Sequence, residues 1–262
     1  MISIDYIIPT WNSESTLELT LSSIRRYGSP NRIIVIDKHS TDRTAAIAGQ
    51  YGCEVIPSDR GLGAARRLGA REAGTDLIAF VDSDVELLPD WEEVLQASAD
   101  RRYSDAGVIG ALYADDYIRP LTEPVSLLGG NGAFGCCVTY RRCVLACTAL
   151  DAFSSGEDAL YAEFLAGKNL RWYILPVYVN HHQEMRDIPG SERWRWLGAG
   201  LRRRKGFQPS ICKSVLGGAV VGIPMNGLDL SYRENVTLRL NYFIGYMLPD
   251  RYFEIDRVKK RS

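Results

Sequence analysis

The feature that most constrains the fold is a regular alternation of short apolar runs and longer amphipathic stretches in the first third of the chain. Four apolar runs have strand length: Ser3–Ile8, Arg32–Ile36, Cys53–Pro57 and Asp76–Val81. The stretches between them have helical length: Glu14–Tyr27, Asp42–Tyr51 and Gly63–Ala73. Strands that are apolar throughout are typical of a parallel sheet with helices on both faces. The alternation therefore predicts an α/β fold, with Ser40 or Thr41 capping the second helix.

Composition and charge limit the classes of function. The chain has 262 residues, a net charge of −1 and 46% hydrophobic residues, which suits one large α/β domain or a domain with a helical appendage. The near-neutral charge gives no support for a nucleic-acid partner. Asp5 interrupts the first apolar stretch, so no signal peptide is expected, and no apolar run reaches the length of a membrane-spanning helix. We therefore expect a cytoplasmic protein.

The C-terminal part differs in composition from the rest. Ser191–Phe207 contains three aromatic and six basic residues, with Glu192 as its only acid. Ile211–Ile223 is apolar and glycine-rich, and Val236–Leu248 has the pattern of an amphipathic helix. This mixture suits a peripheral contact with an anionic membrane surface, and it equally suits packed helices with a solvated charged face. Both interpretations stay open for a helical extension over residues 186–262.

Polar residues directly follow three of the predicted strands. In chain order they are Thr10 and Asn12, then Asp37, then the triplet Asp82-Ser83-Asp84. In an open parallel sheet, ligands bind beyond the carboxyl ends of the strands, so these side chains are expected to line one crevice. A single carboxylate in such a place is commonly a turn or cap residue. Three such positions together indicate a binding site.

The triplet also suggests a metal. Asp82 and Asp84 are one residue apart at the end of a buried strand, where two carboxylates repel each other. Mn²⁺ or Mg²⁺ would relieve that repulsion, because these ions prefer oxygen ligands and take diphosphate oxygens as further ligands. The ion would neutralise charge that develops on a departing diphosphate. Considered alone, the triplet is explained equally well by turn aspartates that cap the following helix.

Four segments resemble, in order and spacing, the motifs of family 2 glycosyltransferases of the GT-A fold. The segments are Ile7-Ile8-Pro9-Thr10-Trp11-Asn12-Ser13-Glu14, Val35–Thr44, Arg60–Gly69 and Phe80-Val81-Asp82-Ser83-Asp84. The resemblance is strong over about residues 3–92 and weaker to about residue 182. It implies a Rossmann-like GT-A catalytic domain over residues 1–185, with a donor-binding half (1–92), an acceptor half (93–185) and the helical extension after it.

The resemblance implies a role for each matching residue. The pocket for a nucleotide-diphosphate sugar would be lined by Pro9, Thr10, Asn12, Glu14, Asp37, Arg66, Asp82, Ser83 and Asp84. Asp37 would contact the base or ribose, and Arg66 would approach the diphosphate or help close the pocket. Asp82 would face the ribose or the metal, and Asp84 would ligate the metal. UDP is the commoner donor nucleotide in the family, and GDP is the alternative. Lys38 and His39 stand where the family has an acid and a glycine, which bears on the base and on the local turn.

An inverting transfer needs a base that takes the proton of the acceptor hydroxyl. The segment Ser155–Asp158 matches the family's Glu-Asp pair at the start of a helix, which implies Asp158 as the base and Glu157 as the second candidate. Acids are also common in the first turn of a helix without any catalytic role. The pair therefore gains its functional interpretation from the motifs upstream.

The acceptor side is marked more weakly. The resemblance implies a glycine-rich acceptor loop that contains Gly130, Asn131 and Gly132. It also implies His181 or His182 as a further metal or diphosphate ligand, although a structural histidine beside a solvated one explains the pair as well. The acceptor itself stays open between a polyprenyl-linked sugar, a free glycan and a protein.

Three other functions are compatible with parts of the sequence. An NAD-dependent oxidoreductase would explain Gly61 and Gly63 after a strand, but Arg66 occupies the third glycine position. A nucleotidyltransferase would need a glycine-rich phosphate loop after the first strand, where this chain has Trp11–Glu14. A non-catalytic relative that binds a sugar nucleotide would not need the acids of the triplet or Asp158.

Overall fold

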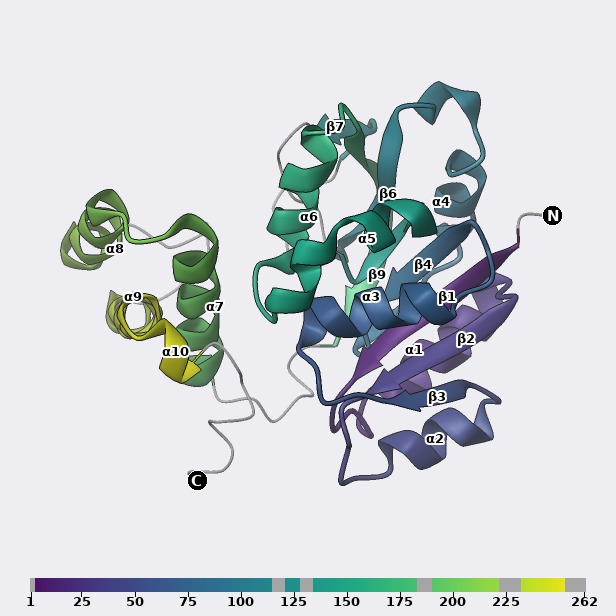
Figure 1. The fold of residues 1–262 in the computed structure, drawn as a ribbon, viewed down its shortest axis with the longest axis horizontal. Helices are drawn as coiled ribbons and strands as arrows, with labels where there is room; N and C mark the ends of the chain where they lie inside the picture. The colour runs from purple at the N-terminus through teal and green to yellow at the C-terminus, as the bar shows by residue number, and fades with distance from the viewer. Residues whose placement is uncertain (1–2, 115–120, 128–133, 183–189, 222–231, 253–262) are drawn as a thin grey trace. The chain divides into compact units, whose positions relative to one another are not determined.

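The computed structural model describes residues 3–114, 121–127, 134–182, 190–221 and 232–252. The chain divides into two compact units, shown in Figure 1. The first comprises residues 1–152 and 157–186, and the second comprises residues 153–156 and 187–262. Gly130, Asn131 and Gly132, which we expect on the acceptor side, lie outside the described residues.

A mixed sheet forms the centre of the first unit. Its strands are β1 (Ile4–Thr10), β2 (Arg32–Asp37), β3 (Glu54–Pro57), β4 (Leu77–Val81), β5 (Val85–Glu86), β6 (Ala106–Tyr113), β7 (Val125–Leu127), β8 (Cys136–Tyr140) and β9 (Arg171–His181). They lie in the order β3-β2-β1-β4-β8-β6-β9-β5, with β7 paired to β9. Strands β1 to β4 run parallel as predicted, whereas β8 runs antiparallel to both β4 and β6. The predicted α/β fold is confirmed.

Helices cover both faces of this sheet. They are α1 (Leu17–Ser23), continued by a π-helical turn (Ile24–Gly28), α2 (Thr44–Gln50), α3 (Leu62–Glu72), α4 (Trp91–Ala97), α5 (Arg141–Ala146) and α6 (Glu157–Ala166). Alternate residues of β1 serve opposite faces: Tyr6 and Ile8 pack with α1, α2 and α4, and Ile7 packs with α3, α5 and α6. A Cβ at Gly69 would collide with Ile7, so this glycine lets α3 lie directly against β1.

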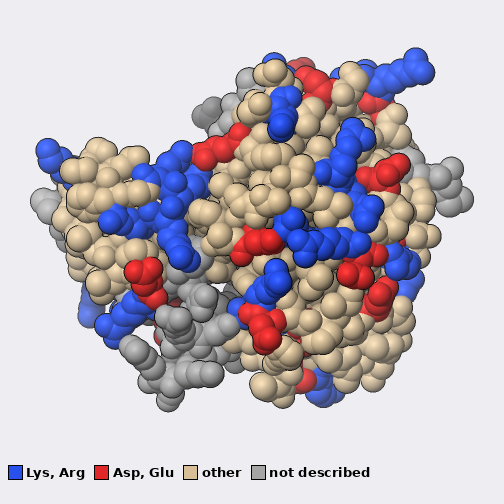
Figure 2. All heavy atoms as spheres, in the orientation of Figure 1, with Lys and Arg blue, Asp and Glu red and all other residues tan. Residues whose placement is uncertain are grey.

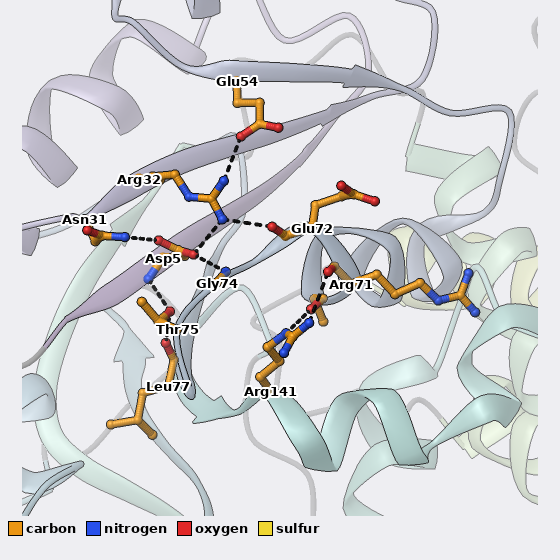
Figure 3. Close-up of polar contacts among 11 residues, drawn as sticks. Asp5, Asn31, Arg32, Glu54, Arg71, Glu72, Gly74, Thr75, Leu77 and Arg141 are labelled. Carbon is orange, nitrogen blue, oxygen red and sulfur yellow. Dashed lines mark hydrogen bonds and ion pairs between the residues drawn. The ribbon is translucent and has the colours of Figure 1, made fainter.

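A buried carboxylate ties the N-terminal ends of the central strands together (Figure 3). Asp5 on β1 accepts hydrogen bonds from Asn31 Nδ2 at 2.8 Å, Arg32 Nη2 at 3.1 Å and the Gly74 N–H at 2.7 Å. Arg32 also donates to Glu54 on β3, at 3.1 Å. Burial acts to raise the pKa of Asp5, but the hydrogen bonds that it accepts outweigh burial and hold the pKa below its usual value. This end of the sheet is therefore fixed by charge and hydrogen bonding.

The second unit is helical. Its helices are α7 (Gly190–Lys205), α8 (Pro209–Val221), α9 (Tyr232–Met247) and α10 (Pro249–Tyr252). Helices α7 and α9 approach closely at two glycines, which have no Cβ. A Cβ at Gly198 would collide with the Tyr242 carbonyl, and one at Gly245 would collide with the Arg195 carbonyl. The predicted helical extension is thus present. Within the described residues, no helix has the length and apolar character that crossing a membrane requires.

Candidate functional site

The carboxyl ends of β1 and β2 meet at Asp37. In the parallel pair, Thr10 lies opposite Asp37, and its Oγ1 donates to Asp37 Oδ1 at 3.1 Å. Ser40 donates twice to the same carboxylate, from its N–H at 3.0 Å and from its Oγ at 2.6 Å. Pro9 is buried within β1, opposite Ile36. Asp37 is therefore held in one orientation at the edge where the sequence predicts a ligand.

The loops that follow β1 and β2 are bonded to each other. Ser40 Oγ accepts the Asn12 N–H at 2.9 Å, and Asn12 Oδ1 accepts the Thr41 N–H at 2.9 Å. Glu14 Oε2 accepts the Arg43 N–H at 3.0 Å. The two loops thus form one bonded surface beside Asp37, made of the side chains that the motifs single out.

These bonds overturn the expected cap of the second helix. Helix α2 begins at Thr44, whose N–H donates to Asp42 Oδ1 at 2.9 Å. The expectation that Ser40 or Thr41 caps this helix is wrong, because both residues bond to the strand-end loops instead. His39 has φ of 48°, in the left-handed region that glycine adopts most easily. The turn therefore keeps a glycine-like backbone although its residue has a large side chain.

The acidic triplet lies at the carboxyl end of β4. Ser83 is buried, and its Oγ lies 2.8 Å from Ser13 Oγ in the loop after β1. Asp84 is 4% exposed, and its Oδ1 lies 3.7 Å from His181 Nε2. The short strand β5 produces this proximity, since Val85 pairs with His181 of β9. Residues from two distant parts of the chain, the loop after β1 and the end of β9, therefore lie against the triplet.

Arg66 connects the triplet to helix α6. Its side chain is 1% exposed, and its Nη2 donates to Asp82 Oδ1 at 2.7 Å. Its Nη1 donates to Glu157 Oε1, and its Cζ lies 4.8 Å from the centroid of the Phe134 ring. Burial acts to lower the pKa of Arg66, but Asp82 and Glu157 outweigh it and raise the pKa. A permanently charged guanidinium thus joins the triplet to α6 and binds a residue, Glu157, that lies 91 positions from Arg66 in sequence.

Glu157 and Asp158 have different surroundings although they are adjacent. Glu157 is buried against Arg66, and burial raises its pKa to about 7 while Arg66 opposes that shift. Asp158 is half-buried, and its Oδ1 accepts the Ala159 N–H at 2.7 Å. The geometry therefore assigns Glu157 to an internal ion pair and leaves Asp158 as the more accessible carboxylate.

The two histidines also separate. His181 lies beside Asp84, and its ring stacks on Tyr113 with centroids 4.2 Å apart. His182 turns to Glu86, with Nε2 and Oε2 3.0 Å apart. Of the pair expected near the metal, His181 therefore lies against the triplet and His182 pairs with an acid outside it.

Tyr113 and Gly135 belong to the site but were not among the predicted residues. Gly135 accepts the Asp82 N–H at 2.9 Å, and a Cβ there would collide with the Asp82 carboxylate. The same Cβ would lie 2.7 Å from the Tyr113 hydroxyl. Tyr113 is the last residue of β6, a mainly apolar run of strand length, so applying the rule of strand ends to that run would have found it. Gly135 had the weaker signal of ending a glycine-rich run.

The residues fit a divalent ion in part. Within the described residues, no group of three or more His, Cys, Asp or Glu side chains is arranged to hold a metal. Asp84 and His181 form a pair, and one oxygen of Asp82 is engaged by Arg66. Mg²⁺ and similar ions are often held by one or two carboxylates together with substrate phosphates. The pair therefore fits an ion whose remaining ligands come from a bound diphosphate.

The motifs of the strand-end site lie within the sequence pattern of a known family. The sequence pattern of glycosyl transferase family 2 matches residues 5–142, which is more than half of the chain. The chain belongs to this family. The match contains β1 to β4, Arg66 and the triplet, and it ends just after β8.

Relatives of this family 2 chain align over parts of their length. An uncharacterized glycosyltransferase of Mycobacterium tuberculosis is 32% identical over 83 residues, 31% of this chain and 37% of that protein. The poly(ribitol-phosphate) beta-N-acetylglucosaminyltransferase TarS of Staphylococcus aureus is 25% identical over 198 residues, 69% of this chain and 33% of that protein. The chain therefore spans about a third of the length of these relatives.

Solved structures share the fold. The mannosyltransferase PcManGT of Pyrobaculum calidifontis, in complex with GDP-Man and Mn²⁺, has a TM-score of 0.62 at 14% identity, covering 94% of this chain and 86% of that one. TarS in complex with UDP-GlcNAc has a TM-score of 0.54 at 17% identity, covering 95% and 74%. These similarities confirm the predicted GT-A fold.

Proposed function

We propose that this family 2 chain transfers a sugar from a nucleotide-diphosphate donor to an acceptor hydroxyl. The observation that carries the proposal is the placement of Asp37, the acidic triplet and the Glu157–Asp158 helix start at one edge of the sheet, with Arg66 joining the last two. These are the elements that donor binding, diphosphate departure and proton removal require. The membership of glycosyl transferase family 2 supports the same reaction.

The nucleotide would bind over the bonded loops after β1 and β2. Asp37, Asn12 and Glu14 present fixed carboxylate and amide oxygens there, and fixed acceptors suit the hydroxyls and N–H groups of a nucleoside. The two fold neighbours carry UDP-GlcNAc and GDP-Man, so the fold accepts both nucleotides. We infer UDP as the preferred nucleotide, with GDP as the alternative, because UDP is the commoner donor in the family.

A divalent ion, Mn²⁺ or Mg²⁺, would be held by Asp84 and His181, with Asp82 facing it. When bound, such an ion supplies neutralisation of charge on the departing diphosphate. Arg66 keeps Asp82 in place by a 2.7 Å hydrogen bond, so the acid does not have to be reoriented when donor enters. The Mn²⁺ present in the PcManGT complex supports the use of a divalent metal.

Asp158 would act as the general base. The ion pair with Arg66 engages Glu157 and fixes the first turn of α6, which orients Asp158 next to it. A half-buried carboxylate in a helix's first turn can accept the proton of an acceptor hydroxyl while the diphosphate leaves from the opposite face. The transfer would then invert the anomeric centre. A polyprenyl-linked sugar or a glycan would supply the hydroxyl, and Gly130, Asn131 and Gly132 would contact that acceptor.

Release of UDP from UDP-sugars by the purified chain with Mn²⁺ tests this function. We expect slow hydrolysis by the wild type, because water can take the place of the acceptor. Asp158→Asn should hydrolyse the donor at least about 100-fold more slowly than the wild type and should still bind UDP. The reason is that removal of a general base typically lowers a rate by about 10²–10⁴-fold. Unchanged hydrolysis in Asp158→Asn would contradict the base, and no hydrolysis by a folded wild type that binds UDP would favour a non-catalytic binding protein.

A further inference from the structure

The two parts of the chain carry opposite net charge. Residues 187–262 contain fourteen Lys or Arg and seven Asp or Glu, whereas residues 1–186 contain seventeen and twenty-five. The small net charge of the whole chain therefore combines +7 on the C-terminal segment with −8 on the rest. Figure 2 shows Lys and Arg side chains gathered over the second unit, around α7. A concentration of positive charge on one compact unit favours an anionic partner.

The second unit also exposes large apolar side chains. The side chains concerned are 38–52% exposed: Phe207, Leu216, Leu240, Met247 and Leu248. Among the described residues of the first unit, only Leu19 belongs to this class. A free polyanion would contact the cations and leave the apolar side chains in water. A lipid surface with anionic headgroups takes up both kinds of group, the cations at the phosphates and the apolar side chains below them.

The turn between α7 and α8 presents the most exposed of these side chains in a fixed position. Gly206 has φ of +69°, and the Tyr246 hydroxyl donates to its carbonyl at 3.0 Å. The same hydroxyl accepts the Gln208 N–H at 2.7 Å. Between these two anchored residues, Phe207 is 52% exposed, with Arg202 Cζ 4.8 Å from its ring centroid. The turn thus holds an aromatic ring in solvent beside a cation.

We propose that the second unit docks on a lipid surface that carries anionic headgroups. Phe207 enters the boundary between headgroups and acyl chains, and the exposed Arg203 and Lys205 at the end of α7 contact the phosphates. The docking does not depend on the proposed sugar transfer. If both hold, it places the catalytic unit where lipid-linked acceptors are found.

Cosedimentation of the full chain with vesicles tests the docking. Vesicles of phosphatidylcholine alone are compared with vesicles that also contain phosphatidylglycerol. We expect binding to the anionic vesicles, loss of binding near 1 M salt where the screening length is about 3 Å, and little binding to neutral vesicles. The double variant Arg203→Glu, Lys205→Glu should bind at least about 30-fold more weakly, because each cation near the surface contributes about 1 kcal/mol and the new carboxylates are repelled by the headgroups.

Matched variants separate docking from general damage. Phe207→Ser should weaken vesicle binding about tenfold or more through lost apolar burial, and Phe207→Leu should retain most of it. Leu19→Ser, and the double variant Arg71→Glu, Lys168→Glu, make the same chemical changes at exposed positions of the first unit and should bind as wild type. UDP binding should be unchanged in all of them, so a failure here is distinct from a failure of the donor site.

Three results would overturn the docking. The first is equal binding to neutral and anionic vesicles, or none to either. The second is wild-type vesicle binding by both Phe207→Ser and the Arg203, Lys205 double variant. The third is a failure to bind anionic vesicles by a chain that binds soluble polyphosphate, or by a chain that self-associates in a way that Phe207→Ser abolishes. These last outcomes would assign the surface to a free polyanion or to a second copy of the chain.

Discussion

At the scale of single residues, Arg66 connects the parts of the proposed machinery. Its guanidinium is buried and binds two carboxylates, one in the triplet and one at the start of α6. A charge in this position is stable only while its partners remain, and the partners are stable only while the charge remains. We therefore propose that Arg66 is a positioning residue for both the proposed metal ligands and the proposed base.

Replacing Arg66 tests this coupling. Arg66→Met leaves Glu157 buried without its cation, and we expect a loss of about 3–5 kcal/mol in the free energy of unfolding measured with urea. Metal-dependent UDP binding should fall as well, because Asp82 loses its anchor. Arg67→Met is the control: Arg67 pairs with Asp151 away from the triplet, so its loss should cost about 1–3 kcal/mol and leave UDP binding intact. Equal effects of both variants on UDP binding would contradict the positioning role.

The buried Glu157 predicts a pH dependence of stability. Its pKa is raised from 4.5 to about 7 in the folded chain, so the folded state holds its proton more tightly than the unfolded state. The contribution of this group to stability is complete below about pH 4.5 and is lost as the pH rises through 7. The slope is at most about 1.4 kcal/mol per pH unit for one proton.

Unfolding of the ligand-free chain between pH 4.5 and 7.5 measures this slope. Glu157→Gln should flatten it, because glutamine does not titrate. Asp158→Asn should keep the direction of the slope and reduce it only in part, because the neighbouring Asp158 carboxylate contributes to the raised pKa of Glu157. A wild-type slope in Glu157→Gln would show that this carboxyl does not titrate over the interval.

The positions of site residues were predictable where the residues belong to a sequence motif. They were less predictable where a residue's role depends on a contact with a distant part of the chain. Asp37 and the triplet follow strands directly, so strand prediction placed them at one edge. The pairing of Arg66 with Glu157 joins positions 91 residues apart, and no local pattern specifies it. The stacking of Tyr113 on His181 likewise depends on how β6 and β9 pair.

At the scale of elements, the two ends of the central strands differ in what they hold: one end carries the candidate site, and the other carries a structural network. The carboxyl ends of β1 and β2 hold the bonded loops around Asp37, and the opposite ends are joined by the Asp5 network. This division predicts that the Asp5 network can be weakened without affecting the site.

Asp5→Asn tests that division. The folded pKa of Asp5 is below its unfolded value of 3.8, so its contribution is present above that pH and is lost as the pH falls through the folded pKa. We expect Asp5→Asn to lose about 1–3 kcal/mol at pH 7, a difference that shrinks below about pH 4. The exposed Asp76→Asn should show neither effect. Calorimetric UDP binding should be unchanged, and a large loss of affinity in Asp5→Asn would contradict the division.

The elements themselves were predictable to different degrees. Strands β1 to β4 were found because each is mainly apolar, without a regular polar–apolar alternation, and stretches of helical length separate them. The antiparallel direction of β8 was not found, since an apolar run does not encode direction. The start of α2 was misplaced because Ser40 and Thr41 bond to another loop, a tertiary contact that overrides their local preference for capping.

At the scale of the whole molecule, a family 2 domain is joined to a helical unit of opposite charge. The family and the GT-A fold were predictable from the order and spacing of four motifs, which together specify the sheet and its ligand edge. The opposite charges were hidden by a composition that sums to −1. The acceptor loop motif gave no comparable information, because glycine and asparagine mark where a backbone can approach a ligand and not which ligand it is.

Titration calorimetry with UDP and GDP, each with and without Mn²⁺, tests the central claim most directly. We predict that the wild type binds UDP more tightly than GDP, that binding requires the metal, and that Asp84→Ala abolishes it while remaining folded. Failure of the folded wild type to bind either nucleotide with Mn²⁺ present would contradict the claim that this edge of the sheet is a metal-dependent donor site. Equal UDP binding by wild type and Asp84→Ala would contradict the assignment of the triplet to the metal.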